Sequence, residues 1–226
     1  MASISNGPHD CNRKLIAWAF ERLVNRTDVW GAYRDDGGIY TAPWPEYRRG
    51  RDLLNRNILA NHFAGRGSIG VHCISPDGRC TWVAFDIDRH NDAVNAANNW
   101  TITLAIADTI KNAGLEPIVE DSNGAGGYHV WVLFAEPIPV ALAYRLARYI
   151  SVKADVGGIE AFPKQSRLTG KGCGNWLRIP GKHHRREHVS LIYDLDAEHW
   201  HDAKGSVDAL LDATINSTEI VFDLIP

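Results

Sequence analysis

The most constraining feature of this sequence is a short apolar segment, residues 81–88 (TWVAFDID), that ends in two carboxylates. Its apolar side chains alternate as in a β-strand, so Asp86 and Asp88 point to the same face. Two adjacent carboxylates repel each other, and burying them costs hydration energy. A divalent cation removes both costs, because carboxylate oxygens are the natural ligands of Mg²⁺ and Mn²⁺. The segment predicts either a metal site or a strand that simply ends at a capping Asp88.

Length and composition are those of an ordinary globular protein. The 226 residues suffice for one large domain or two small ones, and 45% hydrophobic with 23% charged residues allows a sizeable core. The formal net charge of −3 excludes a global nucleic-acid signature, so any nucleic-acid binding must use local basic patches. No apolar run reaches the length of a membrane span, and the first residues do not resemble a signal peptide. We therefore expect a cytoplasmic protein without membrane contact.

Periodicity and turn signals predict an α+β chain rather than a doubly wound fold. Helices are expected at residues 12–25, 52–64, 92–113, 139–152 and 196–213. Strands are expected at residues 68–75, 80–88, 117–121, 128–134, 158–162, 176–179 and 190–193. We expect one domain, consisting of a loose leader (1–10), an N-terminal helical or irregular part (11–67) and a core (68–226).

The turn signal at residues 76–78 (PDG) predicts a hairpin between the first two of these strands. This hairpin would place Cys73 and Cys80 on facing strands. The four cysteines have no CxxC spacing, so free buried thiols are favoured over a disulfide.

Residues 121–131 (DSNGAGGYHVW) combine a glycine-rich turn with the start of a strong strand. Glycines let the backbone approach a ligand closely, and the amides of such a turn can meet phosphate oxygens. His129 lies on the opposite strand face from Val130. A glycine-rich turn or a single strand histidine is by itself more often structural than functional. The combination of the two is more specific for a functional site.

Two later segments place charges among apolar residues. In residues 158–165 (GIEAFPKQ), Glu160 on a short strand suits a third metal ligand, and Lys164 suits a phosphate contact, although both residues also suit a solvated surface. In residues 174–181 (GNWLRIPG), Arg178 lies between apolar neighbours, where an unpaired charge is costly. It is expected to pair with a protein carboxylate or with a substrate phosphate.

The order of these segments resembles that of the archaeo-eukaryotic primase superfamily. Along the chain the segments are FDID, SNGAGGYHVW, an acid before FPKQ, and GNWLRIPG. The resemblance is closest to the primase-polymerase branch of plasmids, phages and mobile or conflict systems, and it covers residues 69–193. Asp86 and Asp88 match the family's paired acids. Residues 127–129 match its small-residue, any-residue, His motif, with glycine where serine is frequent. Glu160 matches its third acid, with Asp155 as the second candidate.

The resemblance implies a catalytic core with an RRM-like antiparallel sheet flanked by helices, beside an N-terminal αβ unit. It implies a DNA primase-polymerase that transfers nucleotides from NTP or dNTP to a 3′-hydroxyl or to an initiating nucleotide. Two Mg²⁺ or Mn²⁺ ions would be held by Asp86, Asp88 and Glu160. The nucleotide would be bound by His129, Ser122, Gly126, Gly127, Lys164, Gln165, Asn175 and Arg178.

Two basic stretches are candidates for binding a single-stranded DNA template, with solvated surface as the alternative. They comprise Arg48, Arg49 and Arg51, and Lys182, His183, Arg185 and Arg186. Nearby aromatic residues, including Trp30 and Tyr33, suit either base stacking or core packing. His183, His184 and His188 lack partner cysteines at zinc-finger spacing, which disfavours a structural zinc.

A helicase or a primase C-terminal domain is expected in the same or a neighbouring polypeptide. Two other functions stay open at this point. One is a non-catalytic replication-initiator module that binds DNA, and the other is a template-independent nucleotidyl transferase, cyclase or nuclease on a similar sheet.

Overall fold

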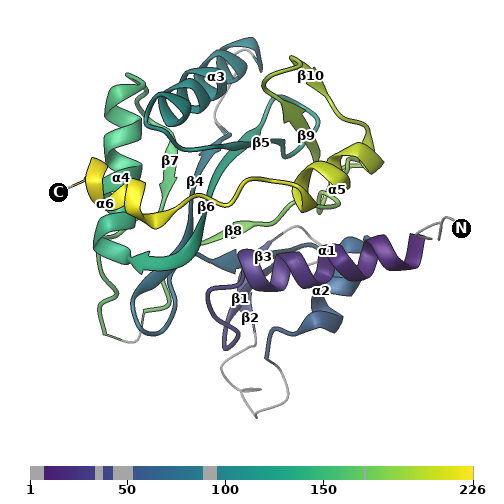
Figure 1. The fold of residues 1–226 in the computed structure, drawn as a ribbon. Coiled ribbons are helices and arrows are strands. Elements are labelled where there is room, and N and C mark those ends of the chain that lie inside the picture. The colour runs from purple at the N-terminus through teal and green to yellow at the C-terminus, as the bar shows by residue number, and fades with distance from the viewer. Residues whose placement is uncertain (1–7, 34–37, 43–52, 89–95, 171, 226) are drawn as a thin grey trace, which may run out of the picture.

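The computed structural model describes residues 8–33, 38–42, 53–88, 96–170 and 172–225, which form two antiparallel sheets with helices packed around them (Figure 1). This arrangement confirms the predicted α+β class. The larger sheet has the strand order β10-β9-β5-β6-β4-β7, and all of its neighbouring strands are antiparallel. Its strands are β4 (Arg79–Ile87), β5 (Ile118–Asp121), β6 (Tyr128–Pro139), β7 (Glu160–Phe162), β9 (Leu191–Asp194) and β10 (His199–Trp200).

The centre of the larger sheet is held by the pairing of β4 with β6. Most side chains of both strands are buried, and helices α3 and α4 pack against them. Trp82 and Trp131 are fully buried between them, with ring centroids 5.1 Å apart at 68°. The indole N–H of Trp82 donates to the carbonyl of Leu23 at 2.8 Å, which ties the sheet to the end of the first helix.

The smaller sheet has the order β2-β1-β3-β8. Its strands are β1 (Trp30–Tyr33), β2 (Ile39–Ala42), β3 (Ile69–His72) and β8 (Trp176–Arg178). Two of these strands come from the expected N-terminal part and two from the expected core. The N-terminal αβ unit is therefore completed by strands from beyond residue 68, and β8 joins it across more than a hundred residues of chain.

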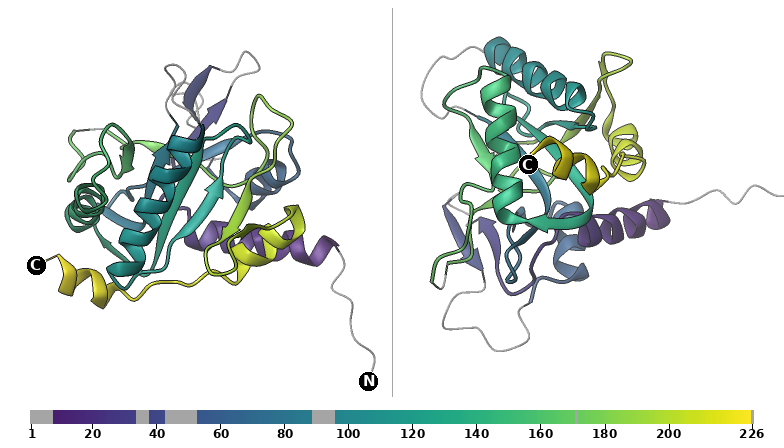
Figure 2. Two further views of the ribbon diagram at one scale, coloured as in Figure 1. Left: turned by 90° about the horizontal axis from the view of Figure 1, so that it is seen from above. Right: turned by 60° about the vertical axis from the view of Figure 1, so that its left-hand side comes forward.

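The helices are α1 (Pro8–Arg22), α2 (Arg56–Phe63), α3 (Ala96–Asn112), α4 (Val140–Lys153), α5 (Ala203–Leu211) and α6 (Thr218–Leu224). Helices α3 and α4 lie side by side on one face of the larger sheet, as Figures 1 and 2 show. Helix α1 packs against α2 and α5. The opposite face of the larger sheet is left for the cleft described below. None of the helices in the described residues is long and apolar enough to cross a membrane.

Several helix boundaries differ from prediction: α1, for example, begins at Pro8, inside the expected leader, and ends at Arg22. For two other helices the difference has a local reason. Helix α2 begins at Arg56 because the side chain of Asn55 accepts hydrogen bonds from the next two free amides. The expected helix over residues 196–213 is wrong in its first half. Residues 199–200 form β10 against β9, and α5 begins only after Asp202, whose carboxylate accepts from the amide of Gly205 at 2.7 Å.

The expected hairpin over residues 68–88 is also wrong. The turn itself forms, since the amide of Ser75 donates to the carbonyl of Arg79 at 2.8 Å. The two strands then part, because β3 pairs with β1 and β8, whereas both edges of β4 are taken by β6 and β7. Cys73 and Cys80 are free thiols, as expected. Burial raises the pKa of both thiols, that of Cys73 to about 12, so they are unreactive core residues.

A packing contact in the smaller sheet depends on two glycines. Gly31 and Gly70 are cross-strand partners, and the ring of Trp176 lies against both. A Cβ atom at Gly70 would lie 2.2 Å from that ring and 2.8 Å from the carbonyl oxygen of Leu177. Because the carbonyl cannot move aside, only glycine fits between β1, β3 and the tryptophan.

Replacement Gly70→Ala is therefore expected to lower the free energy of unfolding by about 1–3 kcal/mol, since the added methyl group overpacks the contact. Urea denaturation measures this change. Gly157→Ala is the matched control, because a Cβ atom there meets nothing within 4 Å, and it is expected to shift the value by less than about 0.5 kcal/mol. A Gly70→Ala protein as stable as the parent would contradict the close packing of Trp176.

Candidate active site

A row of polar side chains crosses the larger sheet on the face that the cleft occupies. Asp86 on β4 is the cross-strand partner of Glu160 on β7 and of His129 on β6. His129 is in turn the partner of Glu120 on β5. Cross-strand partners point to the same face of a sheet, so the register itself gathers these four residues. Three of them were predicted from sequence, and Glu120 was not.

Glu120 is fully buried behind His129 and accepts three hydrogen bonds. Its donors are the ring nitrogen Nδ1 of His129 at 3.0 Å, the indole of Trp131 at 2.9 Å and the hydroxyl of Ser190 at 2.6 Å. Because a carboxylate accepts, Nδ1 carries the proton, and the other ring nitrogen Nε2 faces Asp86, 3.7 Å from its Oδ1 atom. Glu120 thus sets the orientation and tautomer of the histidine.

The charge of Glu120 is maintained by its surroundings. Burial by itself raises the pKa of this carboxyl group, but the neighbouring His129, the hydroxyl of Ser190 and the positive charge of Arg178 outweigh it and hold the pKa at about 2. The sequence did contain a signal for this residue. Glu120 is an acid inside the apolar strand 118–121, which is the same cue that singled out Glu160.

A cleft of about 690 Å³ lies between the two sheets. It gathers eleven of the residues that the sequence predicted. These are Asp86, Asp88, Ser122, His129, Glu160, Lys164, Asn175, Arg178, His183, Arg185 and Arg186. Gly126, Gly127, Gln165 and Lys182 do not line the cleft. Lys182 instead pairs with Glu187 at 3.1 Å. Arg48, Arg49 and Arg51 lie outside the described residues.

The amides of the glycine-rich turn are used within the turn, which differs from the expectation that they face a ligand. Asn123 accepts hydrogen bonds from the amides of Ala125 at 2.8 Å and Gly127 at 2.9 Å. A Cβ atom at Gly127 would lie 2.1 Å from the Asn123 amide nitrogen, so glycine is required there. The turn instead contributes the side chain of Asn123 to the lining of the cleft. The Nδ2 atom of Asn123 is 3.5 Å from the Oδ2 atom of Asp88.

Arg178 brings a nearly buried positive charge to the cleft from β8. Its guanidinium donates to the carbonyl oxygens of Ser122 and Ile179. Within the described residues no carboxylate lies at ion-pairing distance from it, although its charge acts on the pKa of Glu120. Of the two expected partners, a protein carboxylate is therefore not seen. A buried guanidinium facing a cleft suits an anion.

Glu160 and Lys164 form an ion pair with 2.6 Å between Oε2 and Nζ. Asp155, the second candidate for the third acid, follows α4 and does not line the cleft. The described residues hold no preformed group of three His, Cys, Asp or Glu side chains arranged around one metal position. The carboxylates have the oxygen chemistry that Mg²⁺ and Mn²⁺ require, but Lys164 must leave Glu160 before that side chain can bind a cation.

Aromatic and histidine rings also line the cleft. The ring of His184 stacks on Tyr33 with 3.8 Å between centroids and on His183 with 4.4 Å. Burial and the charge of Arg178 lower the pKa of both histidines to about 4, so they are neutral at pH 7. Trp30, another of the aromatic candidates, lies in the core. His184 belongs to the basic stretch 182–186 and lies beside two of the predicted template contacts, His183 and Arg185.

Residues 47–219, which are most of the chain, match the family model described as "TOTE conflict system, Archaeo-Eukaryotic Primase domain". The chain belongs to this family. The match confirms the primase superfamily and its conflict-system branch. No curated protein sequence matches this primase domain.

Two solved structures show the same fold. The primase-polymerase domain of cyanophage S-2L is 11% identical, with a TM-score of 0.52 over 95% of this chain and 98% of its own. The polymerase domain of Mycobacterium tuberculosis Ligase D, solved in complex with DNA, is 13% identical, with a TM-score of 0.50 over 96% of this chain and 93% of its own. At these identities the likeness concerns the fold of the primase domain alone.

Proposed function

We propose that this primase-family chain is a single catalytic domain that acts as a DNA primase-polymerase. It would transfer nucleotides from NTP or dNTP to a 3′-hydroxyl or to an initiating nucleotide, as directed by a single-stranded DNA template. The observation that carries the proposal is the cross-strand row of Glu160, Asp86 and His129, with Asp88 lining the same cleft. Family membership and the polymerase fold support the reaction class.

Three carboxylates, Asp86, Asp88 and Glu160, are proposed to hold two Mg²⁺ or Mn²⁺ ions. When bound, such ions neutralise the triphosphate and lower the pKa of the attacking hydroxyl group. The chain's own task is then to position the nucleotide. His129, held by Glu120, is proposed to contact the triphosphate together with Arg178.

Lys164 is proposed to exchange its ion pair with Glu160 for a phosphate oxygen when a cation and nucleotide bind. Ser122 and Asn175 line the same cleft and are proposed to contact phosphate or sugar. Gln165, Gly126 and Gly127 are proposed to act indirectly by shaping the neighbouring loops, because they do not line the cleft.

The template is proposed to run along residues 183–186, where His183, Arg185 and Arg186 line the cleft. Phosphate contacts of this kind give binding without sequence preference that weakens as salt rises. Contacts with the template outside the cleft are proposed for Arg48, Arg49, Arg51 and Lys182. A DNA complex of the Ligase D polymerase domain supports the choice of DNA.

The deciding experiment is synthesis from labelled nucleotides on single-stranded DNA, with Mg²⁺ or Mn²⁺, with and without a primer. The double variant Asp86→Ala/Asp88→Ala is the control, with circular dichroism to show that it folds. Products that require template and vanish in the variant support the proposal. Template-independent products from ATP alone would favour a nucleotidyl transferase or cyclase. No incorporation, with equal DNA binding by both proteins, would leave a non-catalytic binding module.

A further inference from the structure

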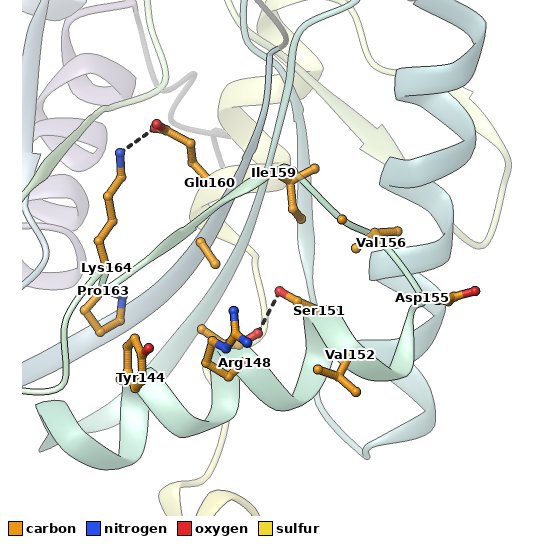
Figure 3. Close-up of a pocket in the computed structure, with 14 residues that line it drawn as sticks. Tyr144, Arg148, Ser151, Val152, Asp155, Val156, Ile159, Glu160, Pro163 and Lys164 are labelled. Atoms are coloured by element: carbon orange, nitrogen blue, oxygen red, sulfur yellow. Dashed lines mark hydrogen bonds and ion pairs between the residues drawn. The ribbon is translucent and has the colours of Figure 1, made fainter.

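A second cavity, of about 620 Å³, adjoins the catalytic cleft between α4 and β7. We call it the α4–β7 groove. Its wall on α4 includes Tyr144, Arg148 and Ser151, which lie on one side of the helix because they are four and three residues apart. Glu160 and Lys164 line both the groove and the cleft. Figure 3 shows these two residues at one end of the groove and Asp155 at the other.

We propose that the α4–β7 groove binds the 3′-terminal nucleotides of the acceptor strand, the strand whose hydroxyl group attacks the incoming nucleotide. This inference rests on the proposed function and specifies where one of its two substrates binds. It assigns a role to Arg148 and Tyr144, which belong to none of the motifs at residues 81–88, 121–131, 158–165 and 174–181.

The first argument is the direction of the reaction. In an in-line displacement at phosphorus the attacking oxygen and the leaving oxygen lie on opposite sides of the reacting atom. The triphosphate end of the cleft is marked by His129 and Arg178, so the leaving pyrophosphate lies there. The attacking hydroxyl group must then approach from the other end of the cross-strand row, which is Glu160. The space beyond Glu160 is the α4–β7 groove.

The second argument is the chemistry of the groove. The guanidinium of Arg148 is exposed, and within the described residues no carboxylate pairs with it. Figure 3 shows Arg148 and Tyr144 rising from α4 toward β7. A guanidinium binds phosphate oxygens well, and a tyrosine ring offers a flat apolar face to a base or sugar. A Cβ atom at Gly157 would meet nothing within 4 Å, so the groove is open at its side.

The third argument is size and charge. A volume of about 620 Å³ falls in the range of single-ligand pockets, which suits the end of one strand rather than a duplex. At the end of the groove nearest the cleft, Lys164 and Glu160 pair with each other, and Asp155 lies at the far end, with Arg148 between the two ends (Figure 3). Arg148 is thus the positive charge in the groove that a phosphate near the end of an acceptor strand would meet.

The test compares Arg148→Ala and Arg148→Glu with Lys153→Ala in primer extension. Lys153 lies on the same helix outside the groove, with its ammonium 5.8 Å from the ring of Tyr149. Arg148→Ala is expected to raise the KM for the primer about 10-fold or more, and Arg148→Glu further, with the KM for dNTP changed less than about twofold. Lys153→Ala is expected to match the parent. An unchanged primer KM, or a raised dNTP KM instead, would overturn the proposal.

A second measurement does not require activity. A primer with 5-iodo-deoxyuridine at its 3′ end is irradiated with the Asp86→Ala/Asp88→Ala protein, and the cross-linked peptide is identified by mass spectrometry. Cross-linking within residues 140–165 that is lost in Tyr144→Leu supports binding of the strand in the groove. This result would hold even if the parent protein synthesised nothing, because a lack of synthesis refutes only the proposed function. Cross-linking confined to residues 183–186 would place the strand elsewhere and overturn the inference.

Discussion

Glu160→Gln is expected to reduce template-directed synthesis by about 10³-fold, because it removes one of the three carboxylates proposed to hold the divalent ions. Such a loss corresponds to about 4 kcal/mol of transition-state stabilisation, which is the scale of a metal ion's electrostatic contribution. The change keeps the size of the side chain. It also removes the ion pair with Lys164, but this pair is largely exposed and contributes little to stability.

The matched control is Asp155→Asn, which removes an acid five residues earlier in the chain. Asp155 lines the far end of the α4–β7 groove but not the cleft, so at saturating primer its variant is expected to retain synthesis within about twofold. Mn²⁺ binding, followed by electron paramagnetic resonance without nucleotide, gives a readout independent of turnover. It is expected to weaken in Glu160→Gln and not in Asp155→Asn. The reverse pattern would make Asp155 the third acid and would contradict the role given to the β4–β7 register.

Glu120→Gln is expected to lower the rate of synthesis about 10- to 100-fold, although Glu120 touches neither the cleft nor a substrate. Hydrogen-bond partners behind metal-ligating histidines have effects of this size when they are removed, and Glu120 holds His129 through a bond of the same kind. Gln keeps the shape but not the charge, so Nδ1 of His129 loses its obligate acceptor. Nuclear magnetic resonance of ¹⁵N-labelled histidine is expected to show a change of tautomer at His129, which a purely structural role would not produce.

Glu116→Gln is the control for this variant, because Glu116 is an exposed acid near the start of the same strand. It is expected to leave both the rate and the His129 signal unchanged. An unaltered rate in Glu120→Gln, with an unaltered histidine signal, would contradict the positioning role.

The same variant is expected to change the acid stability of the protein. The pKa of Glu120 is held at about 2, below its ordinary value of 4.5. A carboxyl group with a lowered pKa stabilises the fold above its unfolded pKa, and this contribution disappears as pH falls through the folded pKa. The parent should therefore lose on the order of 3 kcal/mol between pH 4.5 and 2 from this group. Glu120→Gln should lack that part of the acid transition in urea denaturation.

Local patterns in the sequence were sufficient to predict most helices and strands, because these elements depend mainly on neighbouring residues. Alternation placed Asp86 and Asp88 on one strand face, and the glycine-rich turn was correctly put at the start of β6. The order of motifs was sufficient to identify the family. Local patterns failed at residues 68–88, where the turn was right but the pairing was wrong. A turn reverses the chain, but pairing also depends on which strand edges other segments have already taken.

The sequence by itself determined the α+β class, the primase family and the chemical types at the site, because residue type and alternation are local properties. Only the tertiary structure decided that Glu160 rather than Asp155 lies beside Asp86, that Glu120 supports His129, and that Gly127 shapes its turn instead of lining the cleft. These outcomes depend on the register between strands that are distant in the chain. Register is set by long-range packing of the whole sheet, and no single segment encodes it.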